Sequence, residues 1–213
     1  KEQIAGEYQP GWMLLSYGKK VSVSSSLEGY PAENIVDEDA RTAWVAQSNR
    51  DMEWAQVDLQ RLSSIHAIQV NFDEYGANQK GAVSGVYQSY LIYASVNGED
   101  WSLVVDYGTK KTDTPHDYIE FEEPFKARYI KLQNKEYMVS ENFSVRDLRI
   151  FGKGQGSTPR AVNDFTVERD EADPCKARLC WEAVPDAQGY IVRYGIAGDK
   201  LYNNFQVMGE NTL

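Results

Sequence analysis

The segments Ala55-Gln-Val-Asp-Leu59 and Ile68-Gln-Val-Asn-Phe72 determine the fold class. In each, apolar residues alternate with polar ones at a period of two, which is typical of a β-strand with one buried face. The same alternation recurs at Val21/Val23, Ile119/Phe121, Ile130/Leu132 and Leu148/Ile150. A series of such strands predicts an all-β chain built as an antiparallel sandwich or barrel.

Turns and helices are sparse in this pattern. Asn97-Gly98 and Glu123-Pro124 supply residues that favour turns, so both are predicted to connect strands. The best helix candidate is the short stretch Ala32–Val36. Trp44, Trp54 and Trp101 lie next to predicted strands and are expected in the core.

The composition argues against two classes of partner. The formal net charge is −10 and the sequence contains no run of Lys or Arg, whereas binding to nucleic acid or an anionic membrane needs a basic face. No stretch of about 18 apolar residues is present, so no membrane span is expected. We therefore predict neither nucleic acid nor membrane as a partner.

The C-terminal part has its own pattern. Residues 153–159 are rich in Gly, with Ser and Pro, and predict a flexible hinge. Strand-like segments follow within residues 160–213, namely Val162–Val167, Ala177–Trp181, Tyr190–Tyr194 and Leu201–Val207. A complete seven-stranded sandwich takes about 100 residues, so an incomplete second domain is expected. Cys175 and Cys180 are predicted to be free thiols, because about 16 Å of extended chain separates them. A turn at Asp173-Pro174 would still allow a disulfide.

No catalytic group stands out. His66 falls in a strand and is interpreted as a packing residue, and His116 follows Pro115 in a predicted surface loop. Glycoside hydrolysis needs two carboxylates about 5–10 Å apart, and no pair among the 32 acidic residues is distinguished by its context. We predict that this chain is not itself an enzyme.

Six motifs in order point to a family. They are Val21-Ser-Val-Ser-Ser-Ser26, Ala32-Glu-Asn-Ile-Val-Asp-Glu-Asp-Ala-Arg-Thr-Ala-Trp44, Glu53-Trp-Ala-Gln-Val-Asp-Leu59, Tyr90-Leu-Ile-Tyr-Ala-Ser-Val-Asn-Gly-Glu-Asp-Trp101, Ala127-Arg-Tyr-Ile-Lys-Leu132 and Arg146-Asp-Leu-Arg-Ile-Phe-Gly152. Together they resemble the coagulation factor 5/8 type C (discoidin) domain, whose carbohydrate-binding relatives are the family 32 carbohydrate-binding modules. The resemblance covers residues 16–152 and implies a discoidin-like antiparallel β-sandwich (jelly roll).

Two weaker resemblances concern the flanking parts. Residues 160–207 resemble the first half of a fibronectin type III domain, which implies an incomplete β-sandwich for residues 160–213. Residues 1–15 are interpreted as a leader from an upstream domain, since Gly6–Ser16 is similar to the segment after the catalytic domain of family 43 glycoside hydrolases from gut Bacteroidetes. The resemblance implies a bacterial glycoside hydrolase as parent, located outside the cell, in the periplasm or on the cell surface.

The resemblance also implies a structural calcium site. It assigns to the metal the carbonyls of Asn34 and Asp39, the carboxylate of Asp37 and both oxygens of Thr42. Asp147 and the Arg146 carbonyl close the site. Glu38 replaces the usual glycine and Asp147 the usual glutamate, and an ordinary loop with local Asx hydrogen bonds is the alternative.

Sugar binding is expected on loops at one end of the sandwich, where an aromatic ring packs on the sugar and polar groups bond its hydroxyls. The resemblance places these loops at Leu27–Pro31, Gln47–Met52, Asp73–Gln88 and Glu136–Ser144. The candidate ligand residues are Tyr30, Asn49, Arg50, Tyr75, Asn78, Lys80, Tyr87, Tyr137 and Phe143. For each aromatic residue, packing beneath its own loop is the alternative.

Three functions follow from this resemblance. The first is a carbohydrate-binding module that tethers a glycoside hydrolase to polysaccharide. The second is a membrane- or protein-adhesion domain. The loops are polar and mixed in charge, which argues against binding to lipid. The third is a structural spacer that packs on the catalytic domain and has no ligand.

Overall fold

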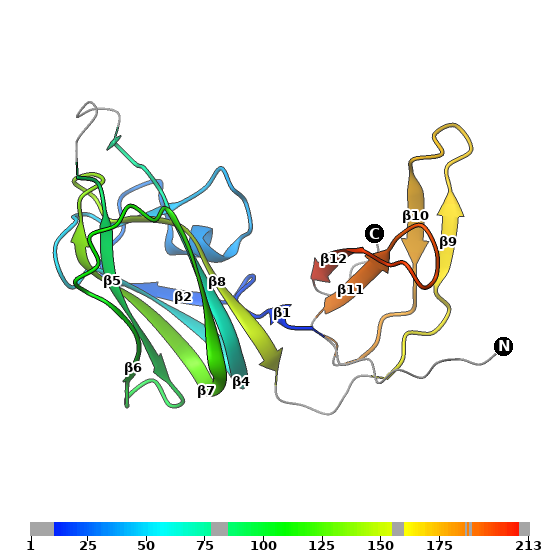
Figure 1. Ribbon diagram of the computed structural model, residues 1–213, viewed down its shortest axis with the longest axis horizontal. Coiled ribbons are helices and arrows are strands. Elements are labelled where there is room, and N and C mark those ends of the chain that lie inside the picture. Colours follow the sequence, from blue (N-terminus) through cyan, green and yellow to red (C-terminus); the bar gives the residue numbers. More distant parts are fainter. Residues whose placement is uncertain (1–10, 78–84, 155–159, 186, 188, 209–213) are drawn as a thin grey trace. The chain divides into compact units, whose positions relative to one another are not determined.

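The computed structural model describes residues 11–77, 85–154, 160–185, 187 and 189–208 (Figure 1). The chain divides into two units, Lys1–Gln155 and Gly156–Leu213. The division falls within the predicted hinge at 153–159, although residues 153 and 154 belong to the last strand of the first unit. The described part is almost entirely β-structure, which confirms the predicted all-β class.

The first unit contains one 3-10 helix and eight strands. The helix η1 spans Ala32–Val36, where the sequence predicts the only helix candidate. The strands are β1 Met13–Leu14, β2 Lys20–Val23, β3 Trp44–Val45, β4 Trp54–Phe72, β5 Gln88–Ser95, β6 Ser102–Tyr107, β7 His116–Tyr137 and β8 Ser144–Gly154. Their order is β1-β8-β4-β7-β5-β6, with β2 added beside β4 and β3 beside β8, and all pairs are antiparallel.

The long strands β4 and β7 each pass through both layers of the sandwich (Figure 1). The first part of β4 pairs with β2 and the last part of β7, and its second part pairs with β8 and the first part of β7. The pairing register shifts between Asp58 and Ser63 and again between Ile65 and Ala67, and Gln60 has a φ of 64°. These irregularities bend the strands from one layer into the other.

One predicted turn is wrong. Glu123-Pro124 lies inside β7, because the alternating segments around Ile119 and Ile130 form one strand rather than two. Pro124 falls between the paired positions Glu120 and Phe125, at the register shift, where its missing N–H breaks no ladder hydrogen bond. The predicted Asn97-Gly98 turn is confirmed between β5 and β6, and Gly98 has a φ of 83°.

The core lies between the two layers. Its largest fully buried side chains are Trp44, Tyr90, Tyr137, Phe143, Ile35, Ile65, Ile68, Ile92, Ile130, Leu132, Leu148 and Ile150. Trp44 is therefore a core residue, as predicted. Trp54 and Trp101 are only half-buried, so the expectation that they belong to the core is wrong.

The second unit has two separate antiparallel pairs. Strand β9 (Thr166–Arg169) pairs with β10 (Ala177–Cys180), and β11 (Gly189–Tyr194) pairs with β12 (Asn203–Met208). Trp181 is buried and packs against Phe165 and Tyr190. Among the described residues many apolar side chains stay exposed, including Val167, Ile196, Tyr202 and Phe205. Cys175 and Cys180 are free thiols.

Candidate ligand-binding and metal-binding loops

At one end of the first unit, a single carboxylate links the loop after β2 to the loop before β4. Glu53 accepts hydrogen bonds from Ser24, from Ser25 at 2.8 Å and from Ser48 at 2.7 Å. Burial raises the pKa of Glu53, but the three hydroxyl donors outweigh it and the net shift is downward. The ionised Glu53 therefore fixes the loop before β4 against the loop after β2.

Asparagine side chains connect the same end to the loop after β7. Asn49 Nδ2 donates to the Ser140 carbonyl at 2.8 Å, and Asn134 Nδ2 donates to the carbonyls of Asn49 and Arg50 at 2.8 and 2.9 Å. Asn49 is thus a loop-fixing residue whose amide N–H groups bond backbone carbonyls. Arg50 has an exposed side chain, and its guanidinium has no hydrogen-bond partner among the described residues.

Two of the predicted sugar-stacking residues are wrong. Tyr137 is 1% exposed and Phe143 is 0% exposed, and both pack on Phe72 in the core. The Tyr137 hydroxyl donates to the Asp73 carbonyl, so the ring anchors the start of the Asp73–Gln88 loop from below. Tyr137 is the last residue of β7, and Phe143 directly precedes β8. At these positions the alternation of buried and exposed residues does not apply, so the sequence did not show whether either ring points into the core.

Tyr30 and Tyr75, two of the predicted aromatic contact residues, pack against each other at this end of the unit. They come from different loops, yet their ring centroids lie 4.9 Å apart with the planes at 69°. Both are half-buried, so each ring keeps an exposed part. Asn78 and Lys80 lie outside the described residues.

Tyr87 belongs to a neighbouring polar cluster. Its hydroxyl donates to Glu136 and accepts from Lys111 Nζ at 2.8 Å, and the same ammonium lies 4.2 Å from the Tyr87 ring centroid. Lys111, followed by Tyr87, lowers the pKa of Glu136, and Glu136 in turn raises the pKa of Lys111. The ring of Tyr87 is therefore covered on one face by Lys111, which the sequence analysis did not single out.

The predicted metal loop follows η1 and brings oxygen atoms together. Thr42 Oγ1 lies 2.8 Å from Asp37 Oδ2 and 2.9 Å from the Asp39 carbonyl oxygen. A carboxylate, a carbonyl and a hydroxyl at these separations are the ligand types that Ca²⁺ prefers, so this part of the set fits the ion. The Asn34 side chain points its amide at the Ala43 carbonyl, at 2.8 Å, and closes the loop.

Two acidic residues of this loop, Glu38 and Asp39, each have an arginine partner. Glu38 has a φ of 60°, in the left-handed region that favours glycine, and its carboxylate is bound by Arg149 on β8. The Arg41 side chain, with two hydrogen bonds to the Asp39 carboxylate, lowers the pKa of Asp39 to about 2. The Asp39 carboxylate is therefore engaged by Arg41 and only its carbonyl faces Thr42.

The residues expected to close the metal site lie on β8. Asp147 is 7% exposed and accepts a hydrogen bond from Asn71 Nδ2 at 2.8 Å. The Arg146 guanidinium pairs with Asp73, on the side of the sugar loops. Strand β8 contacts η1, so the last strand and the metal loop are neighbours.

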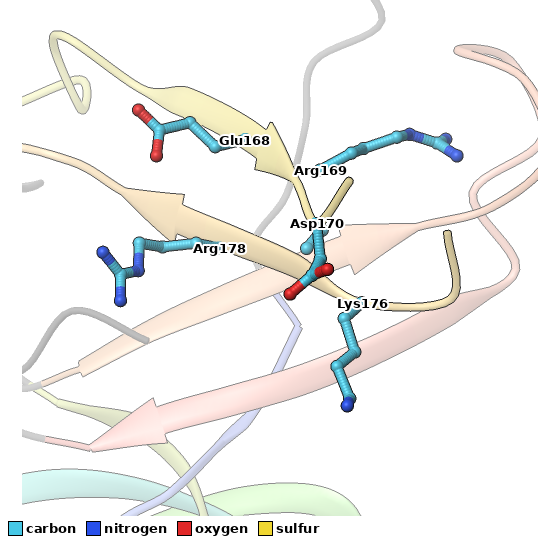
Figure 2. Close-up of a pocket in the computed structure, with 6 residues that line it drawn as sticks. Glu168, Arg169, Asp170, Lys176 and Arg178 are labelled. Carbon is cyan, nitrogen blue, oxygen red and sulfur yellow. The ribbon is translucent and has the colours of Figure 1, made fainter. Parts of the chain in front are cut away.

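A hollow in the second unit lies on the hairpin of β9 and β10 (Figure 2). Its lining side chains Glu168, Arg169, Asp170, Lys176 and Arg178 have both signs of charge, and Figure 2 shows them spread around the hollow rather than aimed at one point. No aromatic ring lines it, so it offers no stacking surface for a sugar.

The described residues contain no group of three or more His, Cys, Asp or Glu side chains arranged to hold a metal ion. Their helical segments include none with the length and apolarity needed to cross a bilayer.

Several solved structures with the same fold are carbohydrate-binding modules. The chitosan-binding module 1 of a chitosanase/glucanase from Paenibacillus sp. IK-5 aligns at a TM-score of 0.55 and 20% identity, covering 65% of this chain and 98% of the module. The family 32 module of NanJ from Clostridium perfringens, in complex with galactose, aligns at a TM-score of 0.52 and 18% identity over 66% of this chain and 98% of the module. At these identities the likeness establishes the fold.

Sequence comparison identifies the family. Lactadherin from Rattus norvegicus is 33% identical over 110 residues, and lactadherin from Mus musculus is 32% identical over the same length. These matches cover 48% of this chain and about a quarter of each lactadherin, so the chain spans only a small part of their length. The F5/8 type C domain family matches residues 20–147, which is more than half of the chain. The chain therefore belongs to the F5/8 type C (discoidin) domain family.

Proposed function

We propose that the first unit is a non-catalytic carbohydrate-binding module whose ligand site lies at the loop end that contains Tyr30 and Tyr75. The observation behind the proposal is this pair of half-exposed rings, 4.9 Å apart and from two different loops. The C–H face of a pyranose is apolar and packs on the negative face of an aromatic ring, while its hydroxyls need polar partners. The free guanidinium of Arg50, at the same end, is a suitable hydroxyl donor.

The solved structures of the same fold support a sugar as the ligand class. The chitosan-binding module 2 from Paenibacillus sp. IK-5 is in complex with chitotriose and aligns at a TM-score of 0.55. A Clostridium perfringens module is in complex with GalNAc-β-1,3-galactose and aligns at 0.53. The ligands differ among these modules, so the sugar that this chain binds has to be found by screening.

A glycan-array screen of the full chain tests the proposal. Galactosides, arabinans, xylans and chitooligosaccharides are presented with calcium and with a chelator, and the wild type is compared with Tyr30→Ala and Tyr75→Ala. Tyr118→Ala is the matched control, because Tyr118 is an exposed tyrosine on β7, away from these loops. Binding of a defined glycan that both loop variants lose and the control keeps supports the proposal.

The opposite result has an equally definite meaning. A folded wild type that binds no glycan overturns the module reading and favours a structural spacer with no ligand of its own. Binding that increases with anionic liposomes and disappears at high salt favours an adhesion domain instead.

We further propose that the loop after η1 binds one structural Ca²⁺. The Asp37 carboxylate, the Asp39 carbonyl and Thr42 would hold the ion, with the Asn34 and Arg146 carbonyls and Asp147 completing the set. Its chemistry would be charge neutralisation between the loop and β8, not catalysis. The support is that the Asp37 carboxylate and the Asp39 carbonyl converge on the Thr42 hydroxyl, which donates a hydrogen bond to each, at 2.8 and 2.9 Å.

The wider setting is also a proposal. We propose that residues 160–213 belong to a fibronectin type III-like domain and that the parent is a bacterial glycoside hydrolase acting outside the cell, in the periplasm or on the cell surface. The support is the resemblance of the flanking segments, together with the chitosanase/glucanase that contains the similar module. Sequencing of the gene on both sides of this segment tests it, since a catalytic domain upstream is required.

A further inference from the structure

A second aromatic surface lies on the outer face of the first unit, beside the loop that precedes β4. It belongs to the layer formed by the first part of β4, the last part of β7, β5 and β6. Along β4, Ala55 and Val57 point into the core, so Trp54 and Gln56 point outward. Along β7, Ile130 and Leu132 are buried, so Lys131 and Gln133 point outward.

Strand pairing brings these outward residues into one patch. Lys131 lies opposite Gln56 on β4 and opposite Tyr93 on β5, while Trp54 lies opposite Gln133. Trp101, which immediately precedes β6, reaches the same patch. We call the set Trp54, Gln56, Tyr93, Trp101, Lys131 and Gln133 the outer platform.

The ammonium of Lys131 lies between two indole rings. Its Nζ is 3.8 Å from the Trp101 ring centroid and 5.6 Å from the Trp54 ring centroid. These cation–π contacts position the charge but provide no hydrogen-bond acceptor. The patch therefore presents a positive charge at a fixed point on an aromatic surface.

Lys131 differs from the other half-buried lysines of this unit. Those are bonded to acceptors, Lys19 to Gln60, Lys110 to Asp117 and Lys135 to Asp51. Within the described residues Lys131 has neither a carboxylate partner nor a hydrogen-bond acceptor, and burial lowers its pKa. The chain has 32 acidic residues, yet none of those described pairs with this half-buried ammonium. A partly buried charge without a partner favours the binding of an anion.

The indole N–H groups have the same property. Trp44 donates its Nε1–H to the Ser25 carbonyl at 3.0 Å. Trp54 and Trp101 have no such acceptor among the described residues, so their N–H groups face solvent. The outer platform thus combines unused donors with two ring faces, and its complement is an acceptor-rich molecule with an apolar face and a negative charge.

The carboxylates nearest to the platform along β4 already have partners of their own. Asp58 is paired with Arg128 at 2.8 and 2.9 Å, and the ionised Glu53 accepts hydrogen bonds from the serine hydroxyls described above. The net charge of −10 repels a polyanion at long range, but this repulsion is screened beyond about 8 Å at physiological salt. Local pairing with Lys131 therefore decides whether an anion binds.

We propose that the outer platform binds a uronic acid residue of an acidic polysaccharide. The carboxylate accepts hydrogen bonds from Lys131 Nζ, the C–H face of the ring packs on an indole of Trp54 or Trp101, and a hydroxyl bonds the Gln56 amide. Gln133 borders the site and donates its amide to Met52 Sδ at 3.1 Å. The site uses neither Tyr30 nor Tyr75, so the proposal stands whether or not these two residues bind sugar.

The test is titration of the full chain with an oligomer of α-1,4-linked galacturonic acid, followed by isothermal calorimetry and by the NMR signals of the indole N–H groups. EDTA is present throughout, because calcium binds this oligomer. The variants are Lys131→Met, which keeps the apolar stem without the charge, and Trp101→Ala. Lys126→Met, an exposed lysine of β7, is the control.

The expected result is binding that Lys131→Met and Trp101→Ala each weaken at least tenfold and that Lys126→Met leaves unchanged. The methyl ester of the same oligomer should bind at least tenfold more weakly, because it keeps the ring and loses the charge. A thermal unfolding midpoint is measured for each variant to verify that it folds. If Trp101→Ala does not fold, the loss of binding in Lys131→Met alone tests the proposal.

Several outcomes overturn the proposal. They are no binding to the folded wild type, equal binding of the methyl ester, equal binding of dextran sulfate, and loss of binding in Tyr30→Ala rather than in Lys131→Met. The last outcome would assign the uronate to the loop end and would leave the proposed function standing.

Discussion

Arg149 on β8 binds the carboxylate of Glu38 with two hydrogen bonds, Nε to Oε1 at 3.0 Å and Nη2 to Oε2 at 2.6 Å. Glu38 makes this contact from a left-handed backbone conformation with a φ of 60°. An ion pair at a partly exposed position contributes roughly 0.2–1 kcal/mol, whereas left-handed strain in a non-glycine residue costs roughly 1–2 kcal/mol. The pair therefore offsets only part of the strain.

Replacement of Glu38 separates these two effects. Glu38→Ala loses the ion pair and keeps the strain, so its free energy of unfolding should fall below that of the wild type. Glu38→Gly loses the same pair but relieves the strain, which exceeds the roughly 0.5–1 kcal/mol of extra unfolded-chain entropy of glycine. Urea unfolding should find Glu38→Gly the more stable variant by about 0.5–1 kcal/mol, and an alanine variant of greater stability would contradict the strain argument.

Phe143→Ala should act on stability and not on ligand contact. The side chain is fully buried against Trp44, Phe72 and Tyr137, and removing such a ring costs about 3–5 kcal/mol. Chemical denaturation measures the loss, and glycan affinity measured on the folded fraction should equal that of the wild type. A variant of unchanged stability with lost glycan binding would restore Phe143 as a contact residue.

Acid stability should depend on Asp58. Hydrogen bonds from Arg128 lower the pKa of Asp58, helped by the Gln60 N–H and opposed by burial. A depressed folded-state pKa adds stability above the unfolded value of about 3.9, and that stability is lost as the pH falls through the folded pKa. Asp58→Asn should therefore be less stable than the wild type at pH 7 and should lose less stability below about pH 4.

The control for this titration is Glu122→Gln, which changes an exposed acid of β7. Its acid unfolding curve should follow that of the wild type. If Asp58→Asn also follows the wild-type curve, the Arg128 pair does not contribute to acid stability.

The calcium proposal predicts a difference between two neighbouring aspartates. Replacing EDTA by calcium at about 100 times its dissociation constant should add about 2.7 kcal/mol to wild-type stability. Asp37→Asn should abolish this gain, because it removes the only loop carboxylate assigned to the ion. Asp39→Asn should keep it, because Arg41 holds that carboxylate and only the carbonyl is assigned. Equal calcium responses of the two variants, measured by thermal midpoint, would reject the assignment.

Period-two patterning predicted the first unit well where a strand is straight and failed where it bends. Ala55, Val57 and Leu59 are buried as expected, and the same alternation places Trp54 on the outer face. The expectation of a buried Trp54 came from residue type rather than from its position in the pattern. The pattern could not show that Pro124 lies inside a strand. Proline usually ends a strand because it has no N–H to donate to the neighbouring strand, but at a bulge that hydrogen bond is absent in any case.

The site was harder to predict than the fold. Tyr30, Tyr75, Tyr137 and Phe143 are all loop or strand-end aromatics, and nothing local distinguishes the two that stay partly exposed from the two that are buried beneath the loops. Burial there depends on pairs from distant segments, such as the Tyr137 hydroxyl and the Asp73 carbonyl. The unpaired state of Lys131 is likewise a property of its three-dimensional surroundings.

The passage of β4 and β7 through both layers has a mechanical consequence. Sliding or opening of one layer against the other would have to break the backbone ladder within these two strands, so the sandwich moves as a rigid body. A load applied to the loops at one end of the sandwich would then be borne by the covalent chain and by hydrogen bonds in shear. A sandwich built this way resists shear between its layers, so a force on its loops is passed on with little deformation.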